Sequence, residues 1–484
     1  MIEKIKDKYK NIPIQVKAAF WFTVCSAVQS GCKFLAMPVL VRLLTTEEYG
    51  IYSVFLSWIQ IVSLFATLNM HCGVFNNAMF KFPDDRSRYT SSAQSVSISA
   101  TLVCLVIYLL FHNYINELFG LPGNFSMLIF IQLLFTEGFP VWSSRQRYEY
   151  RYVSLIAYTS VLSVLYLVFP ILAGYIYPPE KRLEAVIYTG TAVQVLFGLG
   201  FIIYNYVKGK CFYNKEYWKF ALSFNIPLIP HYLSGIILGQ ADRVMIKNQI
   251  SSAAAGIYSF TYNISIVMNI ITQAVNNAIV PYTYEKIKAR DFKKLSSITN
   301  FLLIMLGVMV FMFSAIAPEF IRIFATEEYY EAVYLVPVIS LSSYFTFLYC
   351  LFANVEFYFE KNKFITVASV IGAAANVILN YLLLPVFGYY AAGYTTLFCY
   401  ILFSVSHYIF MRIVCREKID GERIYNGNHI FVISVTVALT TIGLTALYNH
   451  ILIRYCLLAA AVVICVIKRK TIINNLKMIK EKKS

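Results

Sequence analysis

The chain has 484 residues, of which 59% are hydrophobic and 14% are charged, and its mean hydropathy is +0.63. This composition excludes an ordinary soluble domain. The formal net charge of +16 is shared by nucleic-acid-binding proteins, but in so apolar a chain we assign it to short loops that face anionic lipid headgroups. We therefore expect a lipid bilayer, and no nucleic acid, as a partner.

Long apolar segments recur along the whole chain. A helix needs about 20 apolar residues to cross a bilayer. The sequence predicts fourteen such spans, at about residues 18–40, 50–76, 93–112, 124–142, 153–176, 184–207, 221–241, 256–280, 298–317, 333–353, 364–384, 391–411, 429–447 and 451–467. The predicted fold class is an all-α integral membrane protein. Its predicted parts are an N-terminal lobe of spans 1–6 (1–211), a C-terminal lobe of spans 7–12 (212–416), and spans 13–14 with a basic tail (417–484).

Basic residues are distributed unevenly between the two ends of these spans. If the N-terminus is cytoplasmic, 33 of the 41 Lys and Arg residues lie in the two tails and the even-numbered loops, 7 lie in the odd-numbered loops, and Lys33 lies within the first span. Cytoplasmic loops of membrane proteins carry such an excess of positive charge. We predict a multi-pass protein of the bacterial cytoplasmic (inner) membrane with both termini in the cytoplasm.

Sequence signals for catalysis, metal binding or a cofactor are missing. The ten cysteines are scattered without a CxxC pair, and there is no GxSxG, HExxH or P-loop pattern. We also see no secretory signal peptide. The sequence predicts a transporter with no catalytic residues, no metal and no cofactor.

A short sequence recurs at the start of spans 2 and 8. The segments Thr45–Ser53 and Ser251–Ser259 share Gly-Ile-Tyr-Ser, and each follows an odd-numbered span on the outer face. Matching positions indicate that the two six-span halves are parallel repeats, with a binding site predicted between them.

Four basic residues lie where the charge rule does not place them. Lys33 is inside span 1, where an ammonium group costs at least about 2.5–3.5 kcal/mol. Arg42, Arg243 and Lys247 lie at the outer ends of spans 1 and 7. Together the four could line a cationic cavity for a pyrophosphate group, which guanidinium and ammonium groups bind well. The alternative is that they anchor the helices at the lipid interface.

Three acidic or titratable residues accompany these cations. Asp242 could tune Arg243, pair with a neighbouring base or bind a proton. Glu137 and His71 are isolated in spans 4 and 2, where they could carry a coupling proton or pair locally.

Span 7 also contains Pro227, Pro230, Gly235 and Gly239, which predict a kinked or bendable helix. Such a helix suits alternating access, although Pro and Gly also occur in passive spans.

Amide side chains follow one face of span 8. Asn269, Gln273 and Asn276 recur at helical spacing, and Gln60 holds a comparable place in span 2. They could line a hydrophilic lumen for sugar hydroxyl groups, or form hydrogen bonds between helices.

Three segments resemble Wzx-type O-antigen and polysaccharide flippases. They are Arg42–Tyr52, then Gln240-Ala-Asp-Arg-Val-Met-Ile with the following Gly256-Ile-Tyr-Ser, and Asn376–Gly388 with Ala391-Ala-Gly393. These flippases belong to the multidrug/oligosaccharidyl-lipid/polysaccharide (MOP) exporter superfamily. The resemblance implies a two-lobed transporter that moves undecaprenyl-pyrophosphate-linked oligosaccharide, such as an O-antigen of lipopolysaccharide, to the outer leaflet. It implies roles for Asp242 and Arg243, with Lys33 and Arg42 in a cationic cavity. A polysaccharide polymerase or ligase is a possible protein partner.

Two other functions stay open. A multidrug or small-molecule cation-coupled antiporter of the same superfamily would need an anionic cavity, which the basic bias disfavours. A membrane polysaccharide polymerase or acyltransferase would need a catalytic loop or a buried catalytic site, and the predicted outer loops are short.

Overall fold

The computed structural model describes residues 13–480, and within them the side chains other than those of 362–366, 476–477 and 479–480. All regular secondary structure in this range is helical, which confirms the all-α prediction. The chain forms two compact units, Met1–Ile236 and Ile237–Ser484, which we describe separately. The predicted lobe limits at residues 211 and 416 stay predictions.

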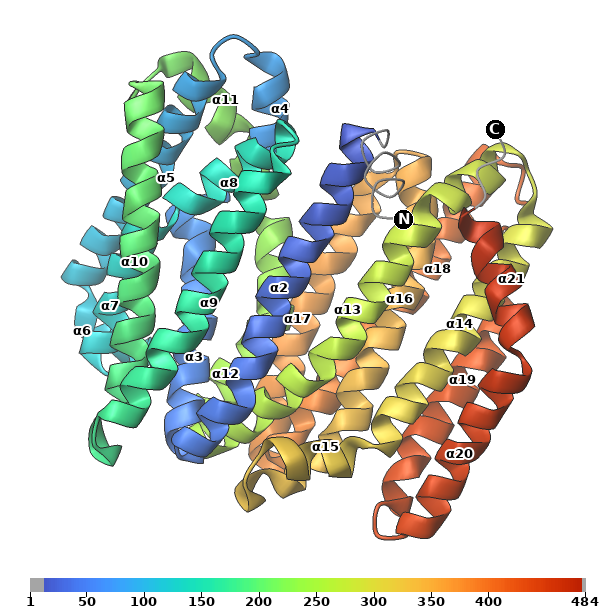
Figure 1. The fold of residues 1–484 in the computed structure, drawn as a ribbon. Helices are drawn as coiled ribbons and strands as arrows, with labels where there is room; N and C mark the ends of the chain where they lie inside the picture. Colours follow the sequence, from blue (N-terminus) through green and yellow to red (C-terminus); the bar gives the residue numbers. More distant parts are fainter. Residues whose placement is uncertain (1–12, 481–484) are drawn as a thin grey trace, which may run out of the picture. The chain divides into compact units, whose positions relative to one another are not determined.

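The first unit is built on long helices that pack side by side (Figure 1). Its helices are α2 (Ile14–Leu43), α3 (Thr46–Thr67), α4 (Gly73–Lys81), α5 (Arg86–Leu110), α6 (His112–Phe119), α7 (Gly123–Thr136), α8 (Gly138–Tyr148), α9 (Tyr152–Ile176), η1 (Pro179–Lys181), α10 (Arg182–Gly209), α11 (Lys215–Asn225) and η2 (Ile226–Leu228). Helix α9 packs between α2 and α10, while α10 also contacts α5, α7 and α8. Helix α3 packs on α5 and α7.

Two glycines allow α10 to cross close to the junction of α7 and α8. A Cβ atom on Gly198 would lie 2.3 Å from the carbonyl oxygen of Phe135, and one on Gly138 would lie 2.6 Å from that of Gly198. Small residues permit this close approach of backbones in a membrane protein. Asn205 then donates to the buried carbonyl of Gly138 at 3.1 Å and to Gln94 of α5 at 2.8 Å. The junction is therefore held by packing and by buried hydrogen bonds.

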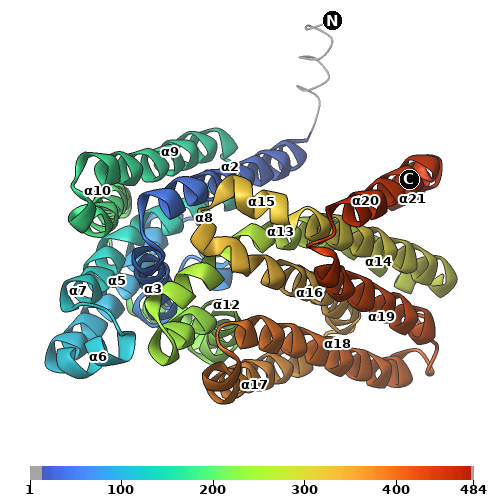
Figure 2. The ribbon, with the colours of Figure 1, turned by 90° about the horizontal axis from the view of Figure 1, so that it is seen from below.

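The second unit surrounds one strongly buried helix. Its helices are the end of α12 (Ile229–Gln249), α13 (Ser252–Lys288), α14 (Phe292–Ala315), α15 (Ala317–Phe324), η3 (Glu327–Leu335), α16 (Val336–Tyr358), α17 (Asn362–Phe387), α18 (Tyr390–Lys418), α19 (Gly427–Gly443), η4 (Leu444–Leu447), α20 (Ile451–Ile467) and α21 (Arg469–Lys480). Helix α16 packs against α13, α14, α18 and α19, as Figure 2 shows from below. Helix α17 packs mainly on α18.

Thirteen helices of the described residues are long and apolar enough to cross a bilayer. A fourteenth span is formed if α20 is taken together with the start of α21, from which it is bent by 62°. The structure therefore confirms a multi-pass membrane protein with thirteen to fourteen spans. The cytoplasmic placement of the termini stays a prediction, and residues 1–12 of the basic N-terminal tail lie outside the described residues.

Candidate functional site

The repeated sequence forms a capped helix start in each unit. Thr45 accepts a hydrogen bond from the backbone N–H of Glu48, whose side chain accepts one from the N–H of Thr45, so α3 begins with a capping box. Ser251 caps α13 by accepting from the N–H of Ala254 at 3.1 Å. In both units the cap is the second residue after the preceding helix ends, at Leu43 or at Gln249.

The turn in the second unit brings Tyr258 to Asp242. The Tyr258 hydroxyl donates to Oδ2 of Asp242 at 2.5 Å, and the Thr396 hydroxyl donates to the same oxygen at 2.9 Å. Asn380 donates through Nδ2 to Oδ1 of Asp242 at 2.6 Å. The carboxylate of α12 therefore accepts hydrogen bonds from α13, α17 and α18, and all four side chains are buried.

A second ring of polar groups orients these donors. Thr395 donates to Oδ1 of Asn380 and to the carbonyl of Ala392. Asn376, one helical turn before Asn380, donates to the Thr396 hydroxyl at 3.3 Å. Because each amide and hydroxyl is held by another, the acidic network (Asp242, Tyr258, Asn376, Asn380, Thr395 and Thr396) is a fixed site and not a set of independent side chains.

The acidic network is suited to bind a proton or a small cation. The three donors that contact Asp242 are neutral, so they satisfy its oxygens without cancelling its charge. A buried carboxylate is costly unless its charge is paired. Tyr258 and Thr396 bring hydroxyl oxygens, which hard cations accept as ligands, to this carboxylate, whereas Asn380 faces it through Nδ2. Within the described residues no group of three or more His, Cys, Asp or Glu side chains could hold a metal ion.

The guanidinium of Arg243, next to Asp242, forms its hydrogen bonds with other groups. Its Nη1 donates to the Gly239 carbonyl at 2.6 Å and to Gln240 at 2.8 Å, and its guanidinium lies 4.5 Å from the centre of the Tyr262 ring. The side chain is buried. A phosphate would have to bind through Nε and Nη2, or replace these partners of Nη1. Lys247 is half-buried one turn further along α12.

The other two predicted cations lie in the first unit. Lys33 and Arg42 belong to α2, and both side chains are exposed. Arg42 is in the last turn of the helix, where a cation interacts favourably with the helix dipole. Lys33 lies ten residues before the helix end, which is too far for the helix dipole to explain its position. Their role in a cationic cavity stays a prediction.

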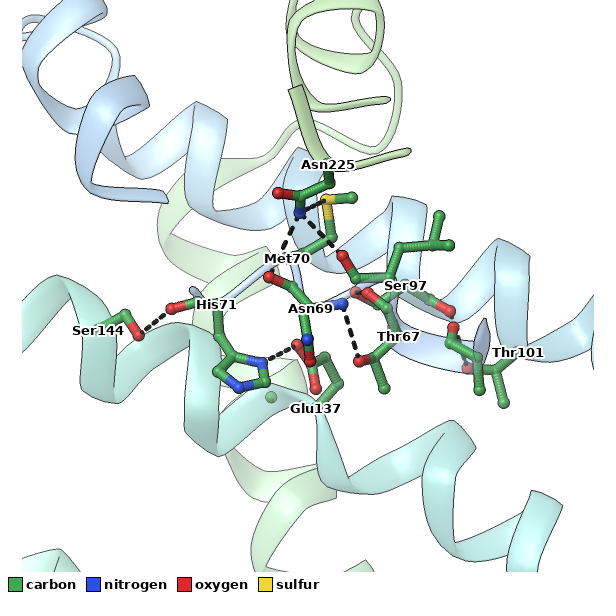
Figure 3. Close-up of polar contacts among 12 residues, drawn as sticks. Thr67, Asn69, Met70, His71, Ser97, Thr101, Glu137, Ser144 and Asn225 are labelled. Atoms are coloured by element: carbon green, nitrogen blue, oxygen red, sulfur yellow. Dashed lines mark hydrogen bonds and ion pairs between the residues drawn. The ribbon is translucent and has the colours of Figure 1, made fainter. Parts of the chain in front are cut away.

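His71 and Glu137 contact each other in the first unit. Figure 3 shows the imidazole facing the carboxylate, with Nδ1 and Oε1 2.9 Å apart. Glu137 lies at the junction of α7 and α8 and is buried, while the His71 side chain is 30% exposed. Of the two predicted possibilities, the structure shows local pairing.

Side chains from three other helices satisfy the open carbonyls at the end of α3 (Figure 3). The chain leaves this helix through Leu68 and Asn69, which both have positive φ angles, so the last carbonyls lose their helical partners. Asn225 of α11 donates to the Leu68 carbonyl at 2.8 Å, Ser97 of α5 to that of Thr67 at 2.9 Å, and Ser144 of α8 to that of His71 at 2.6 Å. His71 is thereby fixed beside Glu137.

The predicted lumen residues have different surroundings. Gln60 and Gln273 are exposed, and Asn269 is half-buried. Asn276 accepts a hydrogen bond from Asn354 of α16 at 3.0 Å, which is the interhelical bonding named above as the alternative for this position. A shared lumen face stays a prediction.

Span 7, predicted to be kinked or bendable, contains a 3₁₀ turn at one of its prolines, and bending at its glycines stays a prediction. Helix α11 ends at Asn225, the 3₁₀ turn η2 contains Pro227, and α12 begins at Ile229. Within α12, a Cβ atom on Gly235 or Gly239 would meet no other atom within 4 Å, so close packing does not require either glycine. The boundary of the two compact units, Ile236–Ile237, lies between them.

Sequence reasoning missed most of the acidic network and one further ionic pair. Asn376 and Asn380 were visible as two amides one turn apart in an apolar span, and Tyr258 as part of the repeat. His407 is an ionisable residue inside predicted span 12, which is itself a functional signal, while Glu356 lies three residues beyond the predicted end of span 10, within α16. They pair through Nδ1 and Oε1 at 2.9 Å, and both are buried.

Comparison with known proteins identifies the family. Residues 16–286, more than half of the chain, match the model of the polysaccharide biosynthesis protein family. Lsg locus putative protein 1 of Haemophilus influenzae is 24% identical over 354 residues, which cover 70% of this chain and 83% of that protein. An uncharacterized membrane protein of the same organism is 25% identical over 352 residues, or 70% and 82% of the two chains.

Solved structures share the fold at low sequence identity. The lipid II flippase MurJ, in an inward closed conformation, has a TM-score of 0.69 at 12% identity, with 93% of this chain and 99% of that chain covered. An inward-facing multidrug resistance MATE family transporter of the MOP superfamily has a TM-score of 0.59 at 14% identity, with 83% and 98% covered. The chain belongs to the polysaccharide biosynthesis protein family and has the fold of the MOP superfamily.

Proposed function

We propose that this protein is a flippase that moves undecaprenyl-pyrophosphate-linked oligosaccharide from the inner to the outer leaflet of the bacterial cytoplasmic membrane by alternating access. The observation that carries the proposal is a buried acidic network in a chain of the polysaccharide biosynthesis family. An ionisable group inside a membrane protein is costly and is usually retained for function.

The substrate assignment rests on the family and on the cations. A lipid-linked oligosaccharide combines a pyrophosphate, a large polar sugar and an apolar tail. Lys33 and Arg42 of the first unit, and Arg243 and Lys247 of the second, are the residues we assign to the pyrophosphate. Arg243 would bind it by exchanging the Gly239 carbonyl and Gln240 for phosphate oxygens. Sugar identity is left open.

Asp242 is the residue we assign to ion coupling. When an ion binds to the acidic network, the net charge of this buried site changes by one unit. Helix α12 carries both Asp242 and the neighbouring Gly235 and Gly239, so the same helix could bind the ion and bend. An ion gradient would then bias the conformations, because the ion binds them with different affinities.

The test uses cells that lack this protein but still make the lipid-linked oligosaccharide. A glycan-modifying enzyme confined to the outer side reports which leaflet holds the intermediate. We expect inner-leaflet accumulation, which the wild-type protein cures and Lys33→Gln, Arg42→Gln or Arg243→Gln cures poorly. If all three variants restore outer-leaflet exposure fully, the cationic binding site is wrong.

A multidrug antiporter is the second candidate, favoured by the likeness to the MATE transporter fold. The same cells distinguish it. Normal outer-leaflet exposure without this protein, together with increased sensitivity to cationic drugs, would support the antiporter and contradict the flippase. Normal exposure with loss only of polymerised glycan would instead indicate an enzyme.

A further inference from the structure

A basic cavity lies at one end of the first unit. Its volume is 730 Å³, and its lining includes Asn76, Arg86, Arg147, Tyr148, Glu149 and Arg151. Asn76 belongs to α4 and Arg86 is the first residue of α5, while the others come from the end of α8 and the connection to α9. The proposed function uses none of these residues.

Among the described residues that line the cavity, the only acidic one, Glu149, is paired with two arginines. Glu149 lies 2.9 Å from Nε of Arg145 through Oε1, and 3.0 Å from Nε of Arg151 through Oε2. Its side chain is 9% exposed, so it is held as a counterion of these two arginines. Glu149 does not pair with Arg86 or Arg147, so it does not balance their charges.

Arg86 and Arg147 are held in place by uncharged partners. The Nε of Arg86 donates to the Met79 carbonyl at 3.2 Å, and its guanidinium lies 5.1 Å from the centre of the Tyr148 ring. The guanidinium of Arg147 lies 5.7 Å from the centre of the Phe22 ring. Among the described residues, neither arginine forms an ion pair. Aromatic contacts orient a guanidinium without neutralising it.

Two helix N-termini meet the same cavity. Helix α5 begins at Arg86, and helix α9 begins at Tyr152 directly after Arg151. Each helix has 25 residues, and neither N-cap residue forms a side-chain capping hydrogen bond. The partial positive charge of such helix ends adds to that of the arginines, while Asp85, the N-cap residue of α5, offsets part of it at that helix.

We propose that this cavity is a binding site for a phosphate group. Planar guanidinium groups match the oxygens of a phosphate in pairs, and the helix ends favour an anion. The phosphate could be the headgroup of an anionic phospholipid or a free phosphate in solution, since both present the same oxygens. The site goes beyond the proposed function, because the substrate-binding cations assigned above lie elsewhere in the sequence.

The test measures binding to the purified full-length protein with two probes. Inorganic pyrophosphate is titrated by calorimetry in a neutral detergent, and phosphatidylglycerol binding is followed by native mass spectrometry. We expect saturable binding of at least one probe. The double variant Arg86→Gln/Arg147→Gln should weaken it at least about tenfold, because both guanidinium groups lose their charge-assisted hydrogen bonds to the phosphate.

Arg88→Gln is the matched control. Arg88 is exposed, lies two residues after Arg86 on α5, and does not line the cavity. Its loss removes the same charge as Arg147→Gln alone, and half of what the double variant removes, so we expect binding within about twofold of wild type from surface electrostatics alone. If the double variant fails to fold, Arg147→Gln alone serves, because that side chain is exposed.

The two probes separate the sources. Weakening of phosphatidylglycerol binding alone identifies a lipid headgroup site, and weakening of pyrophosphate binding alone identifies a site for soluble phosphate. If neither probe binds, or if Arg88→Gln weakens binding as much as the cavity variants do, the proposal is wrong. The flippase assay is not involved, so this result is independent of the proposed function.

Discussion

The two units carry the same turn but give its tyrosine different partners. Tyr52 and Tyr258 each lie seven residues after the cap residue that starts their helix, Thr45 or Ser251. In the first unit the hydroxyl of Tyr52 meets that of Tyr166 on α9. In the second, Tyr258 donates to the carboxylate of Asp242. The repeat therefore preserves the backbone and the tyrosine, while the chemistry differs.

The two units differ in the residue at the matching position of the helix that precedes the turn. Asp242 lies seven residues before the end of α12 at Gln249. The same count from the end of α2 at Leu43 arrives at Ala36. One copy of the repeat therefore has a carboxylate where the other has a methyl group. This asymmetry is why we assign ion coupling to the second unit alone.

Histidine–glutamate pairs give a second comparison. The side chains of His407 and Glu356 in the second unit are 2% and 0% exposed, whereas those of His71 and Glu137 in the first are 30% and 5% exposed. The pairs have the same 2.9 Å distance. Water can replace a lost partner only where it can reach the site.

The largest expected effect is on stability, from removal of these histidines. Loss of one partner from a buried hydrogen-bonded pair costs about 1–3 kcal/mol, and more where the remaining group is charged, because that group is left unpaired. We expect His407→Ala to lower the melting temperature of the purified protein far more than His71→Ala does. The double variant His407→Ala/Glu356→Leu should recover most of the loss, since it leaves no buried charge. Equal effects of the two single variants would contradict the burial comparison.

The second largest effect is expected for the tyrosines of the repeat, Tyr52 and Tyr258. Tyr258→Phe removes a hydrogen bond to a carboxylate, which is worth about 1.5–3 kcal/mol. We expect it to shift the ion concentration that half-saturates transport by about tenfold or more, because every factor of ten corresponds to about 1.4 kcal/mol. Tyr52→Phe is the matched control and should leave the ion dependence unchanged. Equal shifts in both variants would show that the tyrosines act through the turn and not through Asp242.

Substitution of the α12 glycines should reduce transport without lowering the stability of the protein. Alanine is favoured over glycine inside a helix by about 0.5–1 kcal/mol, and neither Gly235 nor Gly239 is required by packing. We expect Gly235→Ala and Gly239→Ala to keep or raise the melting temperature while reducing transport. Gly31→Ala in α2, which also has open space for a methyl group, is the control. Full transport in the α12 variants would rule out bending at these residues.

The smallest expected effect concerns a contact between α15 and α20. Arg454 forms two hydrogen bonds of 2.6 Å with the carboxylate of Glu319, and Tyr455 adds a third. Burial alone would raise the pKa of Glu319, but these hydrogen bonds outweigh it and lower the pKa below the ordinary value of 4.5. Their stabilisation is therefore complete above pH 4.5 and is lost as the pH falls through the lowered pKa.

Melting curves of Glu319→Gln test this contact. The variant should melt below the wild type at pH 7, and the difference should shrink as the pH falls below about 4.5. Glu117→Gln, an exposed position on α6 of the first unit, should show no difference at either pH. A difference that does not depend on pH would mean that the hydrogen bonds do not require an ionised Glu319.

The spans could be predicted from the sequence because span length is set by the bilayer, and the apolar pattern records it directly. Short helices such as α4, α6 and α15 carry no such signal and were missed. So was the division of span 4 into α7 and α8 at Glu137, which follows from how closely α10 crosses there.

The acidic network could be predicted only in part. Asp242 was identified from its position and from the family resemblance. Its partners Asn380 and Thr396 lie 138 and 154 residues further along the chain. The packing of α12, α17 and α18 determines which polar side chains meet over such separations. The spacing of residues within one helix does not determine these contacts.

The most direct test of the account reconstitutes the purified protein in liposomes that contain lipid-linked oligosaccharide. An externally added glycosidase measures how fast the glycan reaches the outer leaflet when a proton or sodium gradient is imposed. We predict gradient-dependent exposure by the wild type and by Asp420→Asn, an acidic residue in the connection between α18 and α19. Asp242→Asn should fall to the rate of protein-free liposomes. Coupling through the acidic network would be contradicted if folded Asp242→Asn exposed the glycan at the wild-type rate, or if the rate did not depend on either gradient.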